Sequence, residues 1–189
     1  KNIDQPRITS LLKKNYINIK NVSFHIIKTN DSWIRDYGPN FIVRNTATGR
    51  QLAINRWLFN SWGKKYPWRK DQNANIQIVN KMDYPWFNPG VVLEGGAIDV
   101  NGKGVCLTTT SCLLNKNRNN SLKINDVEDY LKKFLGVKII IWLEGSLEGD
   151  DTDGHIDNLA RFVNSKTIVY TTDQNEHGAN YKNLKLIPK

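Results

Sequence analysis

The stretch at residues 150–163, DDTDGHIDNLARFV, determines the fold and function that we expect for this chain. Its four carboxylates surround one histidine, His155, and an alternating run typical of a β-strand follows. Two earlier stretches share this design: Asp36 precedes a Gly-Pro turn and a strand in WIRDYGPNFIV, and Glu94 precedes a Gly-Gly turn and a strand in VVLEGGAIDV. The steps from Asp36 to Glu94 and from Glu94 to His155 are 58 and 61 residues. Unless the two intervals agree by accident, this period indicates a repeated unit that delivers one polar group per copy to a common centre.

The composition is that of a globular protein. The chain has 189 residues, of which 39% are hydrophobic and 24% charged, so it can bury a core. The longest apolar run, at residues 137–143, is strand-sized, and we expect no membrane segment. The first residues lack both a signal-peptide pattern and a methionine, which is compatible with an interior piece of a longer protein. Two cysteines, Cys106 and Cys112, make no disulfide framework, so a reducing cytoplasm is the expected location.

The net charge of +9 raises the alternative of a basic binding protein. Lysines and arginines are spread along the whole chain with no run of five or six, which favours a solvated basic surface over a nucleic-acid groove. Aromatic residues among the basic residues at 62–70 keep a non-catalytic binding function open.

The local patterns predict a repeating order of strand, acidic elbow, hairpin and helix within one domain, residues 1–189. The expected helices lie at 8–12, from Asp71 with Ala74, Ile78 and Met82 on one face, and from an Asn125 cap to Gly136. For the segment after Asp71, its β-branched residues leave a strand as the alternative. The expected strands lie at 22–27, 40–43, 52–54, 91–93, 97–100, 105–109, 137–143, 156–163 and 167–171, with irregular segments at 57–68 and 84–90.

Carboxylates gathered at one centre need a positive counterpart. An EF-hand calcium loop around Gly154 fails on spacing. His155 and Asp157 are plausible ligands for zinc or non-haem iron, but no second histidine is evident, so we expect neither a metal nor another cofactor. A planar guanidinium is the better counterpart, because carboxylates hold it with paired hydrogen bonds. A histidine beside it can act as acid and base in a guanidine hydrolase that forms a covalent thiol adduct.

Four motifs together resemble the agmatine deiminase family, which includes the bacterial peptidyl-arginine deiminases. They are WIRDYGPNF from Trp33, LEGGAIDVNGKG from Leu93, TTTSCLLNKNRN from Thr108 and GDDTDGHIDN from Gly149. The resemblance implies an α/β pentein fold, a pseudo-fivefold propeller of β/α modules around a central active site. About three of the five modules are expected in this chain, with the C-terminal portion absent.

The resemblance also implies residue roles. Asp36 and Asp157 would hold the guanidinium, and His155 would be the general acid and base. Glu94 would orient the histidine and add negative potential. Asp153 stands where the motif leads us to expect Asn, and its charge is expected to raise the pKa of His155.

The expected substrate is agmatine, converted to N-carbamoylputrescine and ammonia in polyamine metabolism; peptidyl-arginine is the alternative. By resemblance, Trp33 lines the substrate channel and Asp150 and Asp151 lie near the far end of the substrate. Acids at that end suit an ammonium better than a carboxylate. The expected partners are this cationic molecule and, at most, further copies of the chain. The sequence neither requires nor excludes such a homo-oligomer.

The nucleophile is expected outside this chain. The family's catalytic cysteine belongs to a C-terminal GGGxxHC-type motif, and nothing in residues 171–189 matches it. Cys112 lies in a stretch that is structural in the family, and neither Cys112 nor Cys106 is expected where the other groups converge. The chain alone is therefore expected to be inactive.

Overall fold

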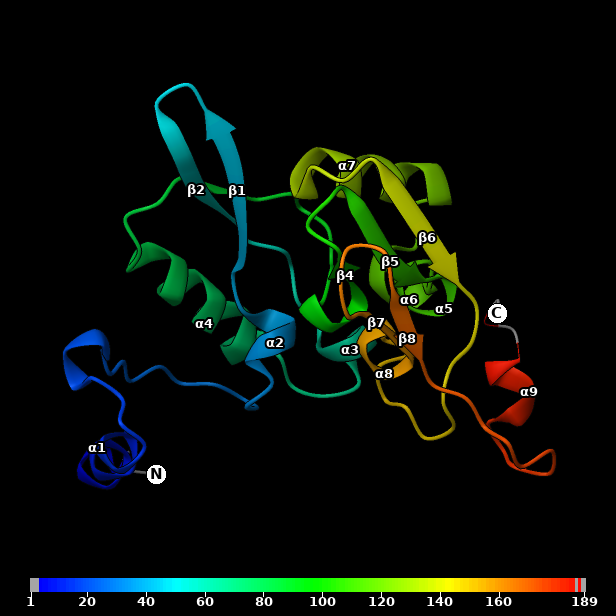
Figure 1. Cartoon of the computed structure of the whole chain (residues 1–189), viewed down its shortest axis with the longest axis horizontal. Coiled ribbons are helices and arrows are strands. Elements are labelled where there is room, and N and C mark those ends of the chain that lie inside the picture. The colour runs from blue at the N-terminus through cyan, green and yellow to red at the C-terminus, as the bar shows by residue number, and fades with distance from the viewer. Residues whose placement is uncertain (1–3, 186, 188–189) are drawn as a thin grey trace.

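Three successive units of the chain are built alike in the computed structural model, which describes residues 4–185 and 187 (Figure 1). Each unit begins with one helical turn and continues into an antiparallel hairpin, which confirms the repeat expected from the spacing. The turns are α2 (Ile34–Tyr37), the 3₁₀ turn η2 (Gly95–Ala97) and α8 (Ile156–Leu159). The hairpins are β1 (Asn40–Thr46) with β2 (Gly49–Asn55), β4 (Asp99–Val100) with β5 (Val105–Thr109), and β7 (Ala160–Phe162) with β8 (Ile168–Tyr170).

The first two units are each completed by a parallel strand. After β2 the chain forms α4 (Arg69–Asn80) and returns as β3 (Trp86–Phe87), which pairs parallel with β2. After β5 it forms α7 (Ile124–Leu135) and returns as β6 (Ile139–Leu143), which pairs parallel with β5. Each returning strand leads into the turn of the next unit, and the turns α2 and α8 both contact η2.

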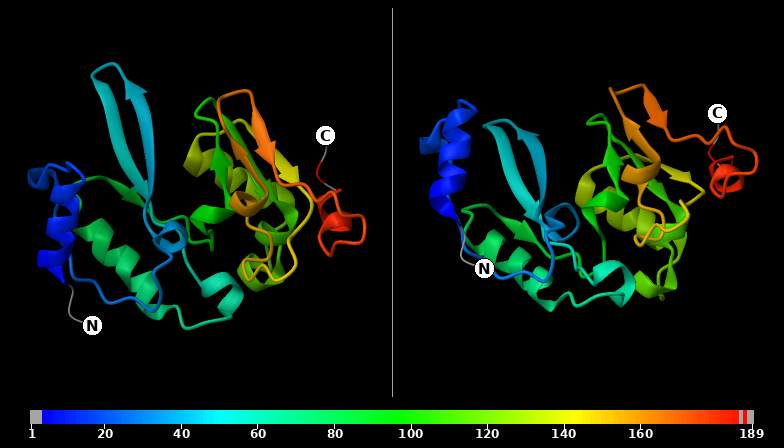
Figure 2. Two further views of the ribbon diagram at one scale, coloured as in Figure 1. Left: turned by 60° about the horizontal axis from the view of Figure 1, so that its bottom comes forward. Right: turned by 90° about the horizontal axis from the view of Figure 1, so that it is seen from below.

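The second and third units lie together, whereas the β1–β2 hairpin stands apart from the β4–β5–β6 sheet (Figure 2). The backbone N–H of Phe162 donates to Asp99 Oδ2 at 2.7 Å, which ties β7 to β4. The three turns therefore meet at one end of their hairpins.

Strand β5 is buried on both faces. Cys106 points into one apolar cluster with Val127 and Leu131 of α7, and Leu107 points into another with Ile156 of α8. Successive side chains of a strand face opposite sides, so β5 serves both clusters at once. This central strand fixes α8, and with it His155, relative to the second unit.

The two long helices begin earlier than the sequence predicted. Helix α4 starts at Arg69, and Asp71 is not its cap: the Asp71 side chain is buried and accepts the backbone N–H of Asn30 at 2.6 Å. Helix α7 is capped at Lys123, not Asn125, because the Asp126 carboxylate accepts the Lys123 N–H at 2.8 Å. Its predicted end at Gly136, with φ of 68°, is confirmed.

Two predicted strands are wrong, and a third is wrong in its first half. Residues 22–27 are extended but have no strand partner among the described residues, and residues 91–93 make only a bridge to Leu58. A strand needs a neighbouring chain for its hydrogen bonds, which an alternating sequence does not supply. The part of 156–163 before Ala160 is the helical turn α8. The expected irregular segments contain α3 (Ser61–Lys64) and β3.

The remaining elements are short. They are α1 (Gln5–Lys14), which includes the predicted helix at 8–12, η1 (Ile19–Asn21), α5 (Thr110–Leu113), α6 (Lys116–Asn119) and α9 (Tyr181–Leu184). None of the helices in the described part of the chain combines the length and the apolarity that crossing a membrane requires.

Candidate active site

The four predicted catalytic side chains come from the three turns. Asp36 lies within α2, and Glu94 is the residue before η2. His155 is the residue before α8, and Asp157 lies in its first turn. Because the turns are in contact, side chains more than a hundred residues apart in sequence meet at one place.

The imidazole of His155 lies between two groups of carboxylates. Its Nδ1 is 3.8 Å from Asp36 Oδ1 and 4.0 Å from Asp157 Oδ1, and its Nε2 is 4.0 Å from Glu94 Oε2. Glu94 and His155 are 0% and 2% exposed, whereas the Asp157 side chain keeps 24% of its surface exposed. The Nδ1 side, with its two aspartates, is thus the side on which a cation could be held.

Gly96 is the backbone position around which these groups gather. Its N–H donates to Asp36 Oδ1 at 2.9 Å. A Cβ added there would lie 2.5 Å from His155 Nδ1 and 2.9 Å from Asp157 Oδ2. A side chain at Gly95 would collide with the carbonyl oxygen of Arg35. The two glycines of the EGG motif are therefore needed for the close approach of the three turns.

The two aspartates have raised pKa values. Burial is the main cause for Asp36, and the nearby charge of Asp157 adds to it. Hydrogen bonds from Gly96 and from Trp62 Nε1, the latter to Asp36 Oδ2 at 3.0 Å, oppose this rise. Burial also raises the pKa of Asp157, against the charge of Arg161. Their mutual repulsion favours a bound cation between them.

Arg118 is a site residue that the sequence reasoning missed. Its side chain is fully buried, and Nε donates to Glu94 Oε1 at 3.0 Å. Its other nitrogens reach Thr152 O at 2.7 Å, Asn117 Oδ1 at 2.8 Å and the Asp153 carboxylate. Burial raises the pKa of Glu94, and the Arg118 charge counteracts it. The available signal is the arginine of NKNRN, in a stretch that is structural according to the family resemblance.

Burial, together with the charge of Arg118, lowers the pKa of His155 to about 4. The charge of Asp153 raises the pKa of His155 as expected, but burial outweighs this effect. Burial alone would raise the pKa of Asp153, but hydrogen bonds from Lys65, Asn117 and Arg118 outweigh it. The Asp153 carboxylate is thus paired with Lys65 and Arg118, and the imidazole of His155 is neutral near pH 7.

The remaining predicted substrate-binding residues are Trp33, Asp150 and Asp151, and their surroundings differ. Trp33, 58% exposed, precedes α2. Asp150 supports its own loop by accepting the N–H groups of Thr152 at 2.9 Å and Gly154 at 3.0 Å. Asp151 accepts the hydroxyl of Tyr66 at 2.7 Å. Their role toward a substrate stays a prediction.

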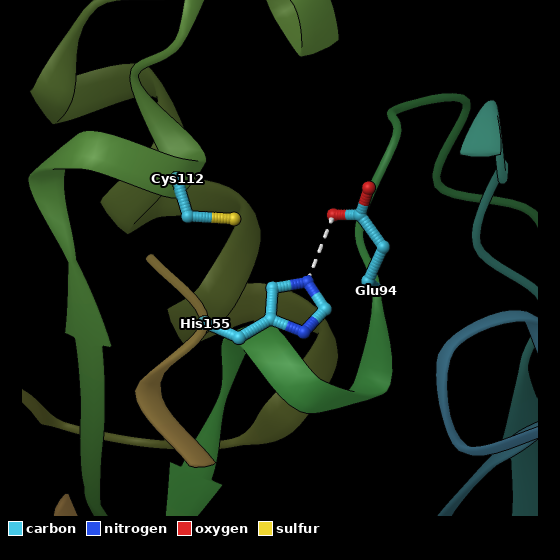
Figure 3. Close-up of side chains that lie close together, drawn as sticks. All are labelled: Glu94, Cys112 and His155. Carbon is cyan, nitrogen blue, oxygen red and sulfur yellow. Dashed lines mark ion pairs between the residues drawn. The ribbon is translucent and has the colours of Figure 1, made fainter. Parts of the chain in front are cut away.

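Cys112 lies beside the site, contrary to the expectation that neither cysteine does. One ligand atom each of Cys112, Glu94 and His155 lie within 4.8 Å of one another, and Figure 3 shows the sulfur pointing toward the space between the other two. The thiol is completely buried, and burial raises its pKa well above 9. A protonated, enclosed thiol is poorly suited to act as a nucleophile.

These three residues are the group within residues 4–185 and 187 that could hold a metal ion. Glu94 Oε2 and His155 Nε2 have no hydrogen-bond partner in this part of the chain. However, the guanidinium of Arg118 already neutralises Glu94, and the thiol is protonated. The arrangement fits a buried ion pair next to a neutral imidazole better than a metal centre.

Comparisons with known proteins agree on one family. The family model of the Porphyromonas-type peptidyl-arginine deiminase matches residues 2–188. An agmatine deiminase of Medicago truncatula is 42% identical over 163 residues, which are 79% of this chain and 44% of that protein. Among solved structures, a cysteine-to-serine variant of C. jejuni agmatine deiminase with substrate bound is 41% identical with a TM-score of 0.79, covering 91% of this chain and 51% of that one. Agmatine deiminase of Enterococcus faecalis is 26% identical with a TM-score of 0.81, covering 96% and 50%. The chain spans about half the length of these relatives.

Proposed function

Since this chain belongs to the Porphyromonas-type peptidyl-arginine deiminase family, we propose that its site binds a guanidino compound and takes part in its hydrolytic deimination. The observation that carries the proposal is the pair Asp36 and Asp157, whose oxygens lie 3.8 and 4.0 Å from His155 Nδ1. A guanidinium placed between these carboxylates would have its reacting carbon next to a neutral imidazole.

The proposed reaction has two halves. In the first, a thiol passes its proton to His155, and the resulting thiolate attacks the guanidinium carbon and forms a C–S bond. The C–N bond then breaks, and the departing nitrogen takes this proton from His155 and leaves as ammonia. In the second, His155 removes a proton from water as the water attacks the same carbon, and the C–S bond breaks to return the thiolate. Because His155 is neutral near pH 7, it can accept the proton that each cycle requires. Glu94, fixed by Arg118, faces the other imidazole nitrogen and stabilises its charged form.

We propose agmatine as the substrate. The site gathers Asp36, Asp157 and Glu94, and agmatine brings positive charge without the carboxylate of free arginine. The relatives named agmatine deiminase support this choice, whereas the name of the matching family supports peptidyl-arginine as the alternative. Deimination of agmatine gives N-carbamoylputrescine and ammonia. The proposal includes a place in putrescine formation and, with two unpaired cysteines, a reducing cytoplasm.

The nucleophile in this proposal is not Cys112, because its thiol is enclosed and protonated. We propose that the thiolate comes from a C-terminal cysteine motif outside these 189 residues. The chain alone should then bind agmatine weakly and release no ammonia. A longer polypeptide that carries such a motif, called the longer polypeptide below, should be active.

The test measures ammonia release from agmatine, free arginine and arginine-containing peptides by the longer polypeptide. Agmatine should be used at least about a hundredfold more efficiently than arginine, because arginine brings an unpaired carboxylate into an acidic site. Comparable kcat/KM values, or a preference for peptides, would overturn the choice of agmatine. Turnover by the 189-residue chain that disappears in Cys112→Ser would show that the nucleophile is wrongly assigned.

A further inference from the structure

Four consecutive residues next to the site have a left-handed backbone. The φ angles of Ser61, Trp62, Gly63 and Lys64 are 53°, 54°, 89° and 67°. Residues other than glycine avoid this region, because their Cβ crowds the backbone, and three of these four are not glycine. Strain of this kind persists where the surrounding structure enforces it, often next to functional groups.

The turn is enforced by contacts on both sides. Asn60 Oδ1 accepts the N–H of Gly63 at 3.0 Å, and Asn60 Nδ2 donates to Asn117 O at 2.9 Å. A side chain at Gly63 would collide with that of Asn117, so the turn lies directly against α6. The turn is therefore a fixed part of the fold.

The left-handed turn directs Trp62 inward. Trp62 is 6% exposed, and its ring meets Phe59 edge-on, with ring centroids 5.5 Å apart at 90°. Tyr66 lies on another side, with centroids 6.0 Å apart. Held in this way, Trp62 Nε1 donates to Asp36 Oδ2 at 3.0 Å, while Gly96 N–H donates to Asp36 Oδ1 at 2.9 Å. Both oxygens of Asp36 are tied, and each retains a lone pair for a ligand.

We propose that Trp62 is a positioning residue for the substrate: its indole N–H fixes the plane of the Asp36 carboxylate for a guanidinium, and the left-handed turn at residues 61–64 places it there. This inference rests on the proposed function. A paired hydrogen bond between two planar groups depends on their relative orientation, so a carboxylate free to rotate would bind the cation less well.

The Trp62 hydrogen bond also acts on the charge of Asp36. The ionisable groups facing Asp36 are Arg35, Asp157, His155 and Glu94. Burial and Asp157 raise the pKa of Asp36, whereas Gly96 and Trp62 lower it. Loss of the indole N–H should therefore raise the pKa of Asp36 and leave it protonated over a wider range of pH.

The variant Trp62→Phe removes the N–H and keeps an aromatic ring, and Trp142→Phe is the matched control. Trp142 Nε1 donates to Glu128 Oε1 at the same distance of 3.0 Å, but outside the site. In the 189-residue chain, the Asp36 carboxyl carbon should titrate at higher pH in Trp62→Phe by NMR and unchanged in Trp142→Phe. In the longer polypeptide, kcat/KM for agmatine should fall about 10- to 100-fold only in Trp62→Phe, with the acid limb of its pH profile moved upward.

A second measurement keeps the inference testable if Trp62→Phe does not fold. The indole N–H resonance of Trp62, observed with ¹⁵N-labelled tryptophan, should follow the titration of Asp36 and lose that response in Asp36→Asn. Two results would overturn the positioning role. One is an Asp36 titration that is unchanged in folded Trp62→Phe. The other is a Trp62 indole resonance whose pH dependence does not follow the titration of Asp36. Failure of the longer polypeptide to deiminate agmatine would instead reject the proposed substrate, since both NMR measurements are independent of turnover.

Discussion

Asp36 and Asp157 are expected to bind the guanidinium, so removing either charge should abolish turnover. In the longer polypeptide, Asp36→Asn and Asp157→Asn should each lower kcat/KM for agmatine about a thousandfold, because each loses a charge-assisted contact in a closed site. Thermal unfolding should change little, since burial already disfavours both charges. The exposed Asp83 offers a control: Asp83→Asn should be fully active. Near-normal activity in either site variant would contradict the assignment.

The buried His155 should make the chain sensitive to acid. Its pKa of about 4 in the folded state lies below the ordinary value of 6.5, so the unfolded chain binds the extra proton between these values. The free energy of unfolding should therefore fall by about 3 kcal/mol as the pH drops from about 6.5 to about 4. The raised pKa values of Asp36 and Asp157 act in the opposite direction, because their folded forms bind protons more readily.

Comparison with His155→Gln isolates the histidine contribution. Urea unfolding at several pH values should give a difference in stability between the parent chain and this variant that grows from pH 4 to pH 7. A difference that does not change with pH would show that His155 is not held neutral by the fold.

The buried Arg118–Glu94 ion pair should contribute more to the free energy of unfolding than an exposed ion pair of this chain does. Replacing Arg118 by Met leaves Glu94 buried and unpaired, and should lower the free energy of unfolding by about 3–5 kcal/mol. The double variant Arg118→Met/Glu94→Gln should recover part of this loss, as a double-mutant cycle by urea unfolding would measure. Lys132→Met, which breaks the exposed Lys132–Glu128 pair, should have little effect. Equal losses in the single and double variants would contradict the pairing.

For single residues, the sequence predicted those on the three turns and missed those that contact them. Asp36, Glu94 and His155 stand at regular intervals before strands, which a linear pattern reveals. Arg118 and Trp62 reach the site only through tertiary packing, across 24 and 26 residues respectively. Cys112 was judged by its motif, and only the fold brings it next to His155.

Among the elements, the turn η2 should tolerate the least change. Gly96→Ala places a methyl group against His155 and Asp157, so the three turns must move apart. Binding of agmatine to the 189-residue chain, measured by calorimetry, should be lost. Gly136→Ala is the matched control: nothing lies near its added Cβ, and its left-handed backbone should cost about 1 kcal/mol of stability without affecting binding. Normal agmatine binding by Gly96→Ala would contradict the convergence described above.

The errors in the predicted strands and turns have a common cause. Short apolar runs such as residues 22–27 and 91–93 match a strand pattern, but strand formation depends on a partner that the local sequence does not specify. The turn α8 was not predicted, because its four residues are too few to show helical periodicity. Helix α7 was predicted well because twelve residues display its apolar stripe fully.

For the whole molecule, the spacing of the elbows was the strongest signal. It predicted three units that share a centre, and the structure confirms them. The parallel pairings β2–β3 and β5–β6 were not predicted, because they join segments separated by a long helix. The motif resemblance predicted the fold class correctly, and the solved relatives confirm it.

The convergence of the three turns also governs when the site can form. The hairpins close over a few residues, and the Gly96–Asp36 and Lys65–Asp153 contacts span 60 and 88 residues. Closing such long loops costs more chain entropy and is slower than forming a hairpin. The hairpins should therefore form before the three turns converge. The site at the three turns then forms late, when the turn that follows His155 docks against η2.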